Sequence, residues 1–228
     1  MRILSAALVN HDTNFCFYDN GKIKYMKVNF ELEEYKMSNK QYISKIISEQ
    51  CVEKADGYFF GKMPGTRDSS QFYLSRALYN TDFLNCVAEE FYKIVENEIG
   101  NFEFQITGQE FSSIPLLVSI PILLEKKYDI KLNSFMIKNE RKTYGIHNYI
   151  EGNTLDLPVL IIGEMCNSTN TFLHCHNVLK YQKFVILPYI FAVLNKYGSK
   201  FPNWNSEDRY LKRDFKPLTI LNRDDLKI

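Results

Sequence analysis

The chain has 228 residues, of which 45% are hydrophobic, and this is enough to bury one substantial core. Lysine and arginine (28) nearly balance aspartate and glutamate (27), so the net charge of +1 gives no argument for nucleic acid or an anionic membrane as partner. No apolar run reaches the ~20 residues that a membrane-spanning helix needs. The five cysteines form no CxxC pair and no secretory leader pattern opens the sequence, which predicts a reducing, cytoplasmic compartment.

The first fifty residues carry signals for a small β structure followed by a helix. Residues 3–9 and 14–18 have strand composition, and Asp19-Asn20-Gly21-Lys22 is a type I′ turn signal that leads into a strand at 23–30. Isoleucines at helical spacing behind a Ser-Asn start predict a helix over 38–51. We expect residues 1–55 to form an N-terminal appendage of hairpin and helix.

The remainder, residues 56–228, has the pattern of an α/β domain. Glycine, proline and aspartate interrupt the stretch from 55 to 80 around a short aromatic strand, and a helix capped by Thr81 and Asp82 follows. Beyond Gly100, strands and helices alternate, with strands expected at 102–107, 134–138, 159–162 and 185–195, helices at 114–127 and 171–181, and an edge strand at 217–221. This alternation predicts a central parallel sheet with helices on both faces, in which ligands bind beyond the carboxyl ends of the strands.

Four motifs lie in one order along this domain. They are Phe60-Gly61-Lys62-Met63 with Ser69-Ser70-Gln71-Phe72-Tyr73-Leu74, then ITGQEFSSIPL at 106–116, then FMIKNERKTYG at 135–145 with Ile150-Glu151-Gly152, and last VLIIGEMCNSTNTF at 159–172. In this order they resemble the acceptor-base hood, the pyrophosphate loop, the flexible loop and the phosphoribosyl pyrophosphate motif of the orotate phosphoribosyltransferases. The resemblance implies the type I phosphoribosyltransferase fold.

The resemblance also implies an activity and a site. The family transfers ribose 5-phosphate between pyrophosphate and a nitrogenous, pyrimidine-like base, uses Mg²⁺ with phosphoribosyl pyrophosphate, and forms a homodimer. Carried over to this chain, the phosphate-binding residues are Lys138, Arg141, Tyr144, Asn167, Ser168, Thr169, Asn170 and Thr171. The catalytic residues are Lys142 and Glu164, Glu164 is also the metal ligand, and the acceptor-binding residues are Tyr73, Lys196 and Lys62.

Departures from the family pattern leave a second interpretation open. The family has two adjacent acids where this chain has Gly163 and Glu164, and its phosphate loop carries glycines that residues 167–171 lack, although these residues keep hydroxyl and amide donors at a helix N-terminus. Lys196 replaces an arginine that reads the carboxylate of the acceptor, which predicts a changed acceptor because lysine is a point charge. The alternative function is a catalytically degenerate protein that acts as a nucleotide-binding, regulatory or partner-binding module.

Three further patterns are weaker. Met1-Arg2-Ile3-Leu4 followed by His11-Asp12-Thr13-Asn14 is similar to the opening of carbamoyltransferases that modify antibiotics and nucleosides, but covers only the start of the chain. His174-Cys175-His176 does not predict a zinc site, because neighbours on a helix point about 100° apart. Cys166 has no histidine and acid partner placed by sequence, so we expect a small buried residue there rather than a nucleophile.

Overall fold

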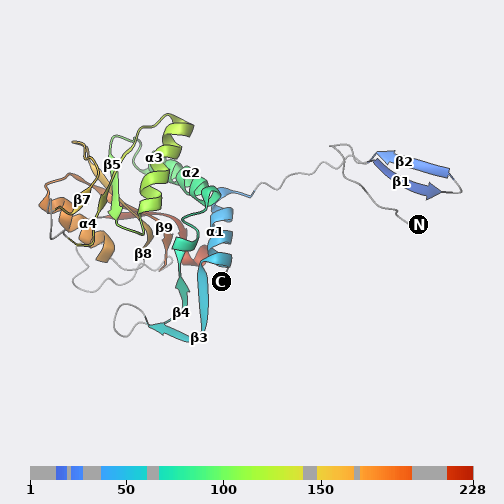
Figure 1. Cartoon of the computed structure of the whole chain (residues 1–228), viewed down its shortest axis with the longest axis horizontal. Helices are drawn as coiled ribbons and strands as arrows, with labels where there is room; N and C mark the ends of the chain where they lie inside the picture. The colour runs from blue at the N-terminus through green and yellow to red at the C-terminus, as the bar shows by residue number, and fades with distance from the viewer. Residues whose placement is uncertain are drawn as a thin grey trace. The chain divides into compact units, whose positions relative to one another are not determined.

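The computed structural model of the chain (Figure 1) describes residues 14–19, 22–27, 37–60, 67–140, 148–166, 170–196 and 215–227. Before residue 37 and within 55–69 the description covers the backbone alone. The chain divides into two compact units, Met1–Lys36 and Met37–Ile228, and each is described by itself.

The first unit contains a β-hairpin. Strands β1 (Asn14–Asp19) and β2 (Lys22–Lys27) pair antiparallel, and Asp19 lies opposite Lys22 in the register. The predicted hairpin is therefore confirmed, with residues 20 and 21 connecting the two strands. The further strand expected at residues 3–9 lies outside the described residues.

The second unit is built on a six-stranded sheet. Its strands follow the order β10-β9-β8-β5-β6-β7, and all neighbours are parallel except β7, which runs antiparallel to β6. The strands are β5 (Gln105–Gln109), β6 (Asn133–Ile137), β7 (Ile150–Glu151), β8 (Val159–Cys166), β9 (Ile186–Asn195) and β10 (Lys216–Asn222). A separate antiparallel pair is formed by β3 (Val52–Phe60) and β4 (Arg67–Phe72), and the sequence pattern did not predict β3 or β7.

Helices cover both faces of the six-stranded sheet, as expected. Helices α1 (Asn39–Gln50), α2 (Thr81–Glu98) and α3 (Ile114–Tyr128) share one apolar cluster with Leu160 and Ile162 of β8. Helix α4 (Asn170–Tyr181) shares a second cluster with Val159 and Ile161 of the same strand. Side chains of β8 therefore alternate between two apolar layers, and the predicted α/β architecture with a largely parallel sheet is confirmed.

Side-chain caps explain where the helices begin. Ser38 and Gln41 form a capping box at the start of α1, and the Asn80 side chain accepts a hydrogen bond of 3.0 Å from the Phe83 N–H at the start of α2. The cap of α2 is thus Asn80, one residue before the expected Thr81. Two short 3₁₀ helices, η1 (Leu74–Arg76) and η2 (Arg223–Asp225), follow β4 and β10.

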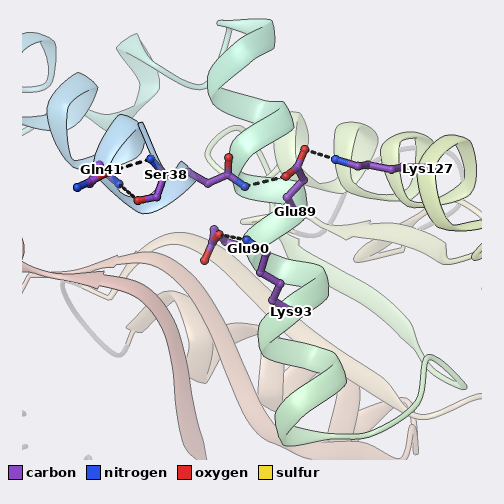
Figure 2. A network of polar contacts seen from close by, with 7 residues as sticks. Ser38, Gln41, Glu89, Glu90, Lys93 and Lys127 are labelled. Carbon is purple, nitrogen blue, oxygen red and sulfur yellow. Dashed lines mark hydrogen bonds and ion pairs between the residues drawn. The ribbon is translucent and has the colours of Figure 1, made fainter. Parts of the chain in front are cut away.

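Helix α1 belongs to the core of the second unit. Ile43 and Ile47 are fully buried in the same cluster as α2 and α3. At the surface, Asn39 donates a hydrogen bond of 2.8 Å to Glu89 of α2, and Glu89 also pairs with Lys127 of α3 (Figure 2). This packing differs from the expected boundary, which grouped α1 with residues 1–55, because the apolar face of α1 is covered by α2 and the sheet.

Candidate functional site

The strand order places a topological switch point between β5 and β8. These strands are neighbours and parallel, but α3 follows β5 on one face of the sheet while α4 follows β8 on the other. The two connections leave the sheet in opposite directions, and in open α/β sheets this arrangement forms the ligand crevice at the carboxyl ends of the strands. The candidate site therefore lies beyond Gln109 of β5 and Cys166 of β8.

The segment after β5 turns back tightly toward β8. A Cβ on Gly108 would lie 2.5 Å from the Ser113 Oγ and 2.6 Å from the Ile162 carbonyl oxygen, so this close approach requires glycine. The Ser113 hydroxyl donates a hydrogen bond of 3.3 Å to that carbonyl. Phe111 lies between Gly108 and Ser113 in the sequence and has a left-handed φ of 66°. This conformation costs about 1–2 kcal/mol for a residue that carries a Cβ.

The segment after β5 also contacts the start of the loop after β6. The Glu110 N–H donates to the Ile137 carbonyl at 2.8 Å, and the Glu110 carboxylate accepts a hydrogen bond of 3.1 Å from the Asn139 N–H. Sequence reasoning missed this carboxylate, although it stands inside the motif that resembles a pyrophosphate loop. The Glu110 carboxylate places a negative charge beyond the carboxyl end of β5, where the sequence predicts phosphate binding.

At the end of β8, Gly163 and Glu164 face opposite layers. A Cβ on Gly163 would lie 3.0 Å from Cζ of Phe172 on α4. Glu164 is the next residue along the strand, so its side chain points to the other face, where Cys51 lies at the end of α1. Burial, together with the smaller effect of the nearby Glu164 carboxylate, raises the pKa of the Cys51 thiol.

The Glu164 carboxyl group is poorly solvated. Its Oε2 atom is buried and has no hydrogen-bond partner within the part of the chain that the structure describes. Burial raises the pKa of Glu164 to about 7, because removing a carboxylate from water disfavours its charged form. A carboxyl group with this pKa can exchange a proton or accept a ligand group at neutral pH.

Two of the predicted acceptor-binding residues are anchored by backbone hydrogen bonds. The Tyr73 N–H donates a hydrogen bond of 2.7 Å to the carbonyl of Cys51, which fixes the start of η1 beside α1. The Lys196 N–H donates to the Cys166 carbonyl at 3.1 Å, and its ammonium group lies 5.9 Å from the ring centroid of Phe72, the residue before Tyr73. The backbone of Tyr73 therefore lies beside Cys51, which is itself near Glu164, and the Lys196 side chain lies near Phe72.

Lys138 has a different environment from the one expected of a phosphate ligand. Its side chain is 8% exposed, and its ammonium group lies 2.7 Å from the Glu151 carboxylate on β7. Its carbonyl oxygen accepts a hydrogen bond of 2.8 Å from Nε2 of His174 on α4. Lys138 therefore pairs β6 with β7, which satisfies at least one of its ammonium donors within the protein.

The other predicted residues are divided between the start of α4 and segments that are not described. Asn170 is exposed at the first position of α4, where backbone N–H groups and the helix dipole favour anions, and Thr171 follows it. The remaining predicted residues, Lys62, Arg141, Lys142, Tyr144, Asn167, Ser168 and Thr169, lie outside the described residues.

The cysteine and histidine side chains near α4 make contacts within the protein. Among residues 170–181, His174 bonds to the Lys138 carbonyl and the ring of His176 packs 5.4 Å from that of Phe215, while Cys175 is buried. Within the described ranges, no three metal-ligating side chains come together. Cys166 is 7% exposed, and burial raises the pKa of its thiol to about 12, which suits a structural residue.

Within the described ranges, each helix is too short or too polar to cross a bilayer.

Comparison with known proteins supports the fold. No family model and no curated protein sequence matches the chain. A phosphoribosyltransferase from Corynebacterium diphtheriae has a similar structure, with 14% identity over 83% of this chain and 99% of that chain and a TM-score of 0.64. An orotate phosphoribosyltransferase from Mycobacterium tuberculosis, in complex with Fe(III) dicitrate, gives 12% identity, the same coverages and a TM-score of 0.64.

The Mycobacterium tuberculosis orotate phosphoribosyltransferase was also solved in complex with 5-phospho-α-D-ribosyl 1-diphosphate, and that structure matches 68% of this chain and 82% of its own at 12% identity, with a TM-score of 0.53. At these identities the comparison establishes the fold. The expected type I phosphoribosyltransferase fold is therefore confirmed.

Proposed function

We propose that this chain, which has the type I phosphoribosyltransferase fold, is a phosphoribosyltransferase of the orotate type. It transfers ribose 5-phosphate between pyrophosphate and a nitrogenous, pyrimidine-like base, in the cytoplasm, as its cysteine usage predicts. The observation that carries the proposal is the Glu164 carboxyl group, which stands at the switch point with its Oε2 atom buried and unpartnered among the described residues.

The phosphate groups of the donor are assigned to two segments. The 5′-phosphate is placed at the start of α4, on Asn170 and Thr171 with Asn167, Ser168 and Thr169, where the helix N-terminus favours an anion. The pyrophosphate is assigned to the loop after β6, through Arg141, Lys142 and Tyr144. The complex of the similar Mycobacterium tuberculosis enzyme with phosphoribosyl pyrophosphate supports this choice of donor.

The Glu164 carboxylate is a suitable ligand for a magnesium ion that arrives with the substrate. Mg²⁺ is commonly held by one or two carboxylates together with substrate phosphates and water, and Glu164 offers one carboxylate with an unpartnered oxygen among the described residues. When bound, the ion would offset negative charge on the pyrophosphate. Glu164 is therefore proposed as the protein's metal ligand as well as a catalytic residue.

The reaction asks the protein mainly for positioning and electrostatics. The bond from C1′ to the pyrophosphate oxygen breaks, and a bond from C1′ to a ring nitrogen of the acceptor forms. Lys142 and Arg141 would stabilise the charge that develops on the leaving pyrophosphate, because fixed cations in a desolvated site need no reorganisation. Tyr73 and Lys196 hold the acceptor in line with C1′, with Lys62 from the hood as a third acceptor contact.

The proposed enzyme is a homodimer that associates through α3. No charged residue occurs between Ile114 and Leu124, and Ser119 is the one polar residue of this stretch. Its outer face exposes Ile114, Val118 and Ile122 by 38%, 55% and 58%. An exposed apolar stripe on a helix is usually covered, and a second copy of this chain is the cover that the proposed function requires.

A specific observation also favours the second function, a degenerate nucleotide-binding, regulatory or partner-binding module. Phe172 occupies the space that a first acid at position 163 would use, and Glu110 adds a negative charge beside the expected pyrophosphate. Both features weaken phosphoribosyl pyrophosphate binding and metal binding relative to a site with two acids.

Turnover separates the two functions. The full chain is incubated with phosphoribosyl pyrophosphate, Mg²⁺ and a panel of pyrimidine and purine bases, and base-dependent release of pyrophosphate is measured. The enzyme proposal predicts release with at least one base, reduced at least about 100-fold in Glu164→Ala and unchanged in Glu103→Gln, an exposed acid before β5. Binding of phosphoribosyl pyrophosphate without release for any base would establish the module instead.

A further inference from the structure

The peptide group between Lys138 and Asn139, just beyond the carboxyl end of β6, is held from two sides. Its carbonyl oxygen accepts a hydrogen bond of 2.8 Å from Nε2 of His174 on α4. Its N–H donates a hydrogen bond of 3.1 Å to the carboxylate of Glu110, in the segment after β5. A peptide group is planar, so its carbonyl and its N–H turn together. One rigid unit therefore connects α4, the end of β6 and the segment after β5.

The same peptide group lies at the base of the loop that follows β6. The Lys138 N–H donates a hydrogen bond of 2.8 Å to the Tyr149 carbonyl, and the Lys138 ammonium lies 2.7 Å from the Glu151 carboxylate. The Tyr149 ring meets the His174 ring edge to face, with 5.9 Å between the ring centroids. His174 therefore contacts the chain both where it enters this loop and where it leaves it.

His174 lies one helical turn after the first residue of α4. Asn170 is four residues earlier, and residues four apart on a helix lie on the same face. The N-terminus of α4 is the proposed site of the 5′-phosphate, and the loop after β6 is the proposed site of the pyrophosphate. His174 therefore makes a direct contact between the two segments to which the proposed function assigns the phosphates.

We propose that His174 is a positioning residue that fixes the pyrophosphate segment relative to the 5′-phosphate segment. This inference rests on the proposed function, because it concerns a donor that carries a phosphate group at each end. Such a donor gains affinity from both segments only when the distance between the segments matches its own length. Without the hydrogen bond from His174, each segment can still bind a separate anion, but the two segments are no longer held at the spacing of one molecule.

A purely structural role for His174 predicts a different pattern of binding. If the side chain only stabilised the fold, its loss would lower the thermal midpoint and weaken every ligand to a similar degree. A positioning role weakens the ligand that spans both segments and spares ligands that occupy one segment each. Ribose 5-phosphate carries only the 5′-phosphate, and inorganic pyrophosphate lacks the ribose, so these two compounds are the single-segment ligands.

The test measures binding of phosphoribosyl pyrophosphate, ribose 5-phosphate and pyrophosphate to the full chain by titration calorimetry, each with Mg²⁺. Wild type is compared with His174→Phe, which removes the N–H donor but keeps an aromatic ring beside Tyr149. It is also compared with His174→Gln, whose amide is a donor that can restore the bond to the carbonyl. The matched control is His176→Phe, which changes the other histidine of α4, whose ring packs against Phe215.

We expect His174→Phe to weaken the binding of phosphoribosyl pyrophosphate about 10- to 100-fold, because a small misplacement of a binding segment is costly for a ligand that spans two. The affinities for ribose 5-phosphate and for pyrophosphate should change less than about twofold, because each ligand needs only one segment. His174→Gln should recover part of the loss, and His176→Phe should match the wild type.

Each other result overturns one specific claim. Equal affinity of wild type and His174→Phe for phosphoribosyl pyrophosphate overturns the inference and leaves the proposed function standing. A similar loss for all three ligands with a lower thermal midpoint also overturns the inference, because it marks a structural role. A wild type that binds none of the three overturns both proposals. If phosphoribosyl pyrophosphate binding depends on His174 but no base gives turnover, the inference stands and the proposed enzyme fails.

Discussion

The ring of Phe172 occupies the space beside the α-carbon of Gly163, where a Cβ on Gly163 would lie 3.0 Å from Phe172 Cζ. Phe172 is 2% exposed and belongs to the apolar cluster between α4 and the sheet, so it has little room to withdraw. The glycine that replaces the first acid of the phosphoribosyltransferase motif is therefore matched by a large residue on the helix that follows.

This match predicts that an acid cannot be restored at position 163 by one change. Gly163→Asp should destabilise the fold by about 1–3 kcal/mol, because overpacking forces neighbours out of their rotamers. The double variant Gly163→Asp, Phe172→Ala should lose at least about 1 kcal/mol less unfolding free energy than the two single variants lose in sum. Urea unfolding of the four proteins measures this coupling, and additive free energies would contradict the contact.

Gly108 should be far less tolerant of substitution than Gly100. Gly108→Ala places a Cβ 2.5 Å from the Ser113 side chain and 2.6 Å from a backbone oxygen that cannot swing away, so we expect a loss of about 3 kcal/mol. Gly100 has a φ of +81° but no atom near its missing Cβ, so Gly100→Ala should cost about 1 kcal/mol from backbone strain alone. Equal losses in thermal unfolding would be inconsistent with the tight turn after β5.

The stability of the fold should depend on pH through Glu164. Burial raises its pKa from 4.5 to about 7 in the folded chain, so the folded state binds the proton more tightly than the unfolded state. The stability that this group contributes is therefore fully present below pH 4.5 and is lost as the pH rises through about 7. Glu164→Gln stays neutral and should gain on the order of 2 kcal/mol relative to wild type between about pH 5 and pH 8.

Urea unfolding in metal-free buffers across this pH range measures the effect. Glu103→Gln, which changes an exposed acid just before the amino end of β5, serves as the control and should follow the wild type. Parallel pH curves for wild type and Glu164→Gln would show that the Glu164 carboxyl group is solvated in the folded chain.

The exposed face of α3 should control assembly. If the proposed dimer forms through this face, Val118→Glu places a charge in the centre of the apolar stripe and should give a monomer, because a buried unpaired carboxylate is costly. Val185 is 68% exposed just before β9, so Val185→Glu adds the same charge elsewhere and should leave the dimer intact. Sedimentation equilibrium decides the matter, and a monomeric wild type or a dimeric Val118→Glu protein would refute the interface.

Much of the fold could be predicted from the sequence, because strand and helix patterns alternate strongly beyond Gly100. Strand β3 escaped prediction because its residues mix charged and apolar types without strict alternation and lie beside a stretch rich in glycine and proline. Strand β7 has two residues, Ile150 and Glu151, which is too short for any periodic signal. Grouping α1 with the hairpin ignored its buried isoleucines, whose partners on α2 are distant in sequence.

The sequence predicts site residues that belong to a recognisable motif, but not contacts between segments that are far apart in the sequence. The family resemblance predicted Glu164, and the structure buries its carboxyl group at the end of β8. The pairing of Lys138 with Glu151 carried no sequence signal, because it depends on a two-residue strand.

The most direct test of the central claim is calorimetric titration of the full chain with phosphoribosyl pyrophosphate and Mg²⁺. Wild type is compared with Glu164→Ala, Lys142→Ala and the control Lys180→Ala. We predict micromolar binding that weakens at least about tenfold in the first two variants and is unchanged in the control. Absence of binding at millimolar ligand, or equal affinity in all four proteins, would contradict the account of the switch point as a phosphoribosyl pyrophosphate site.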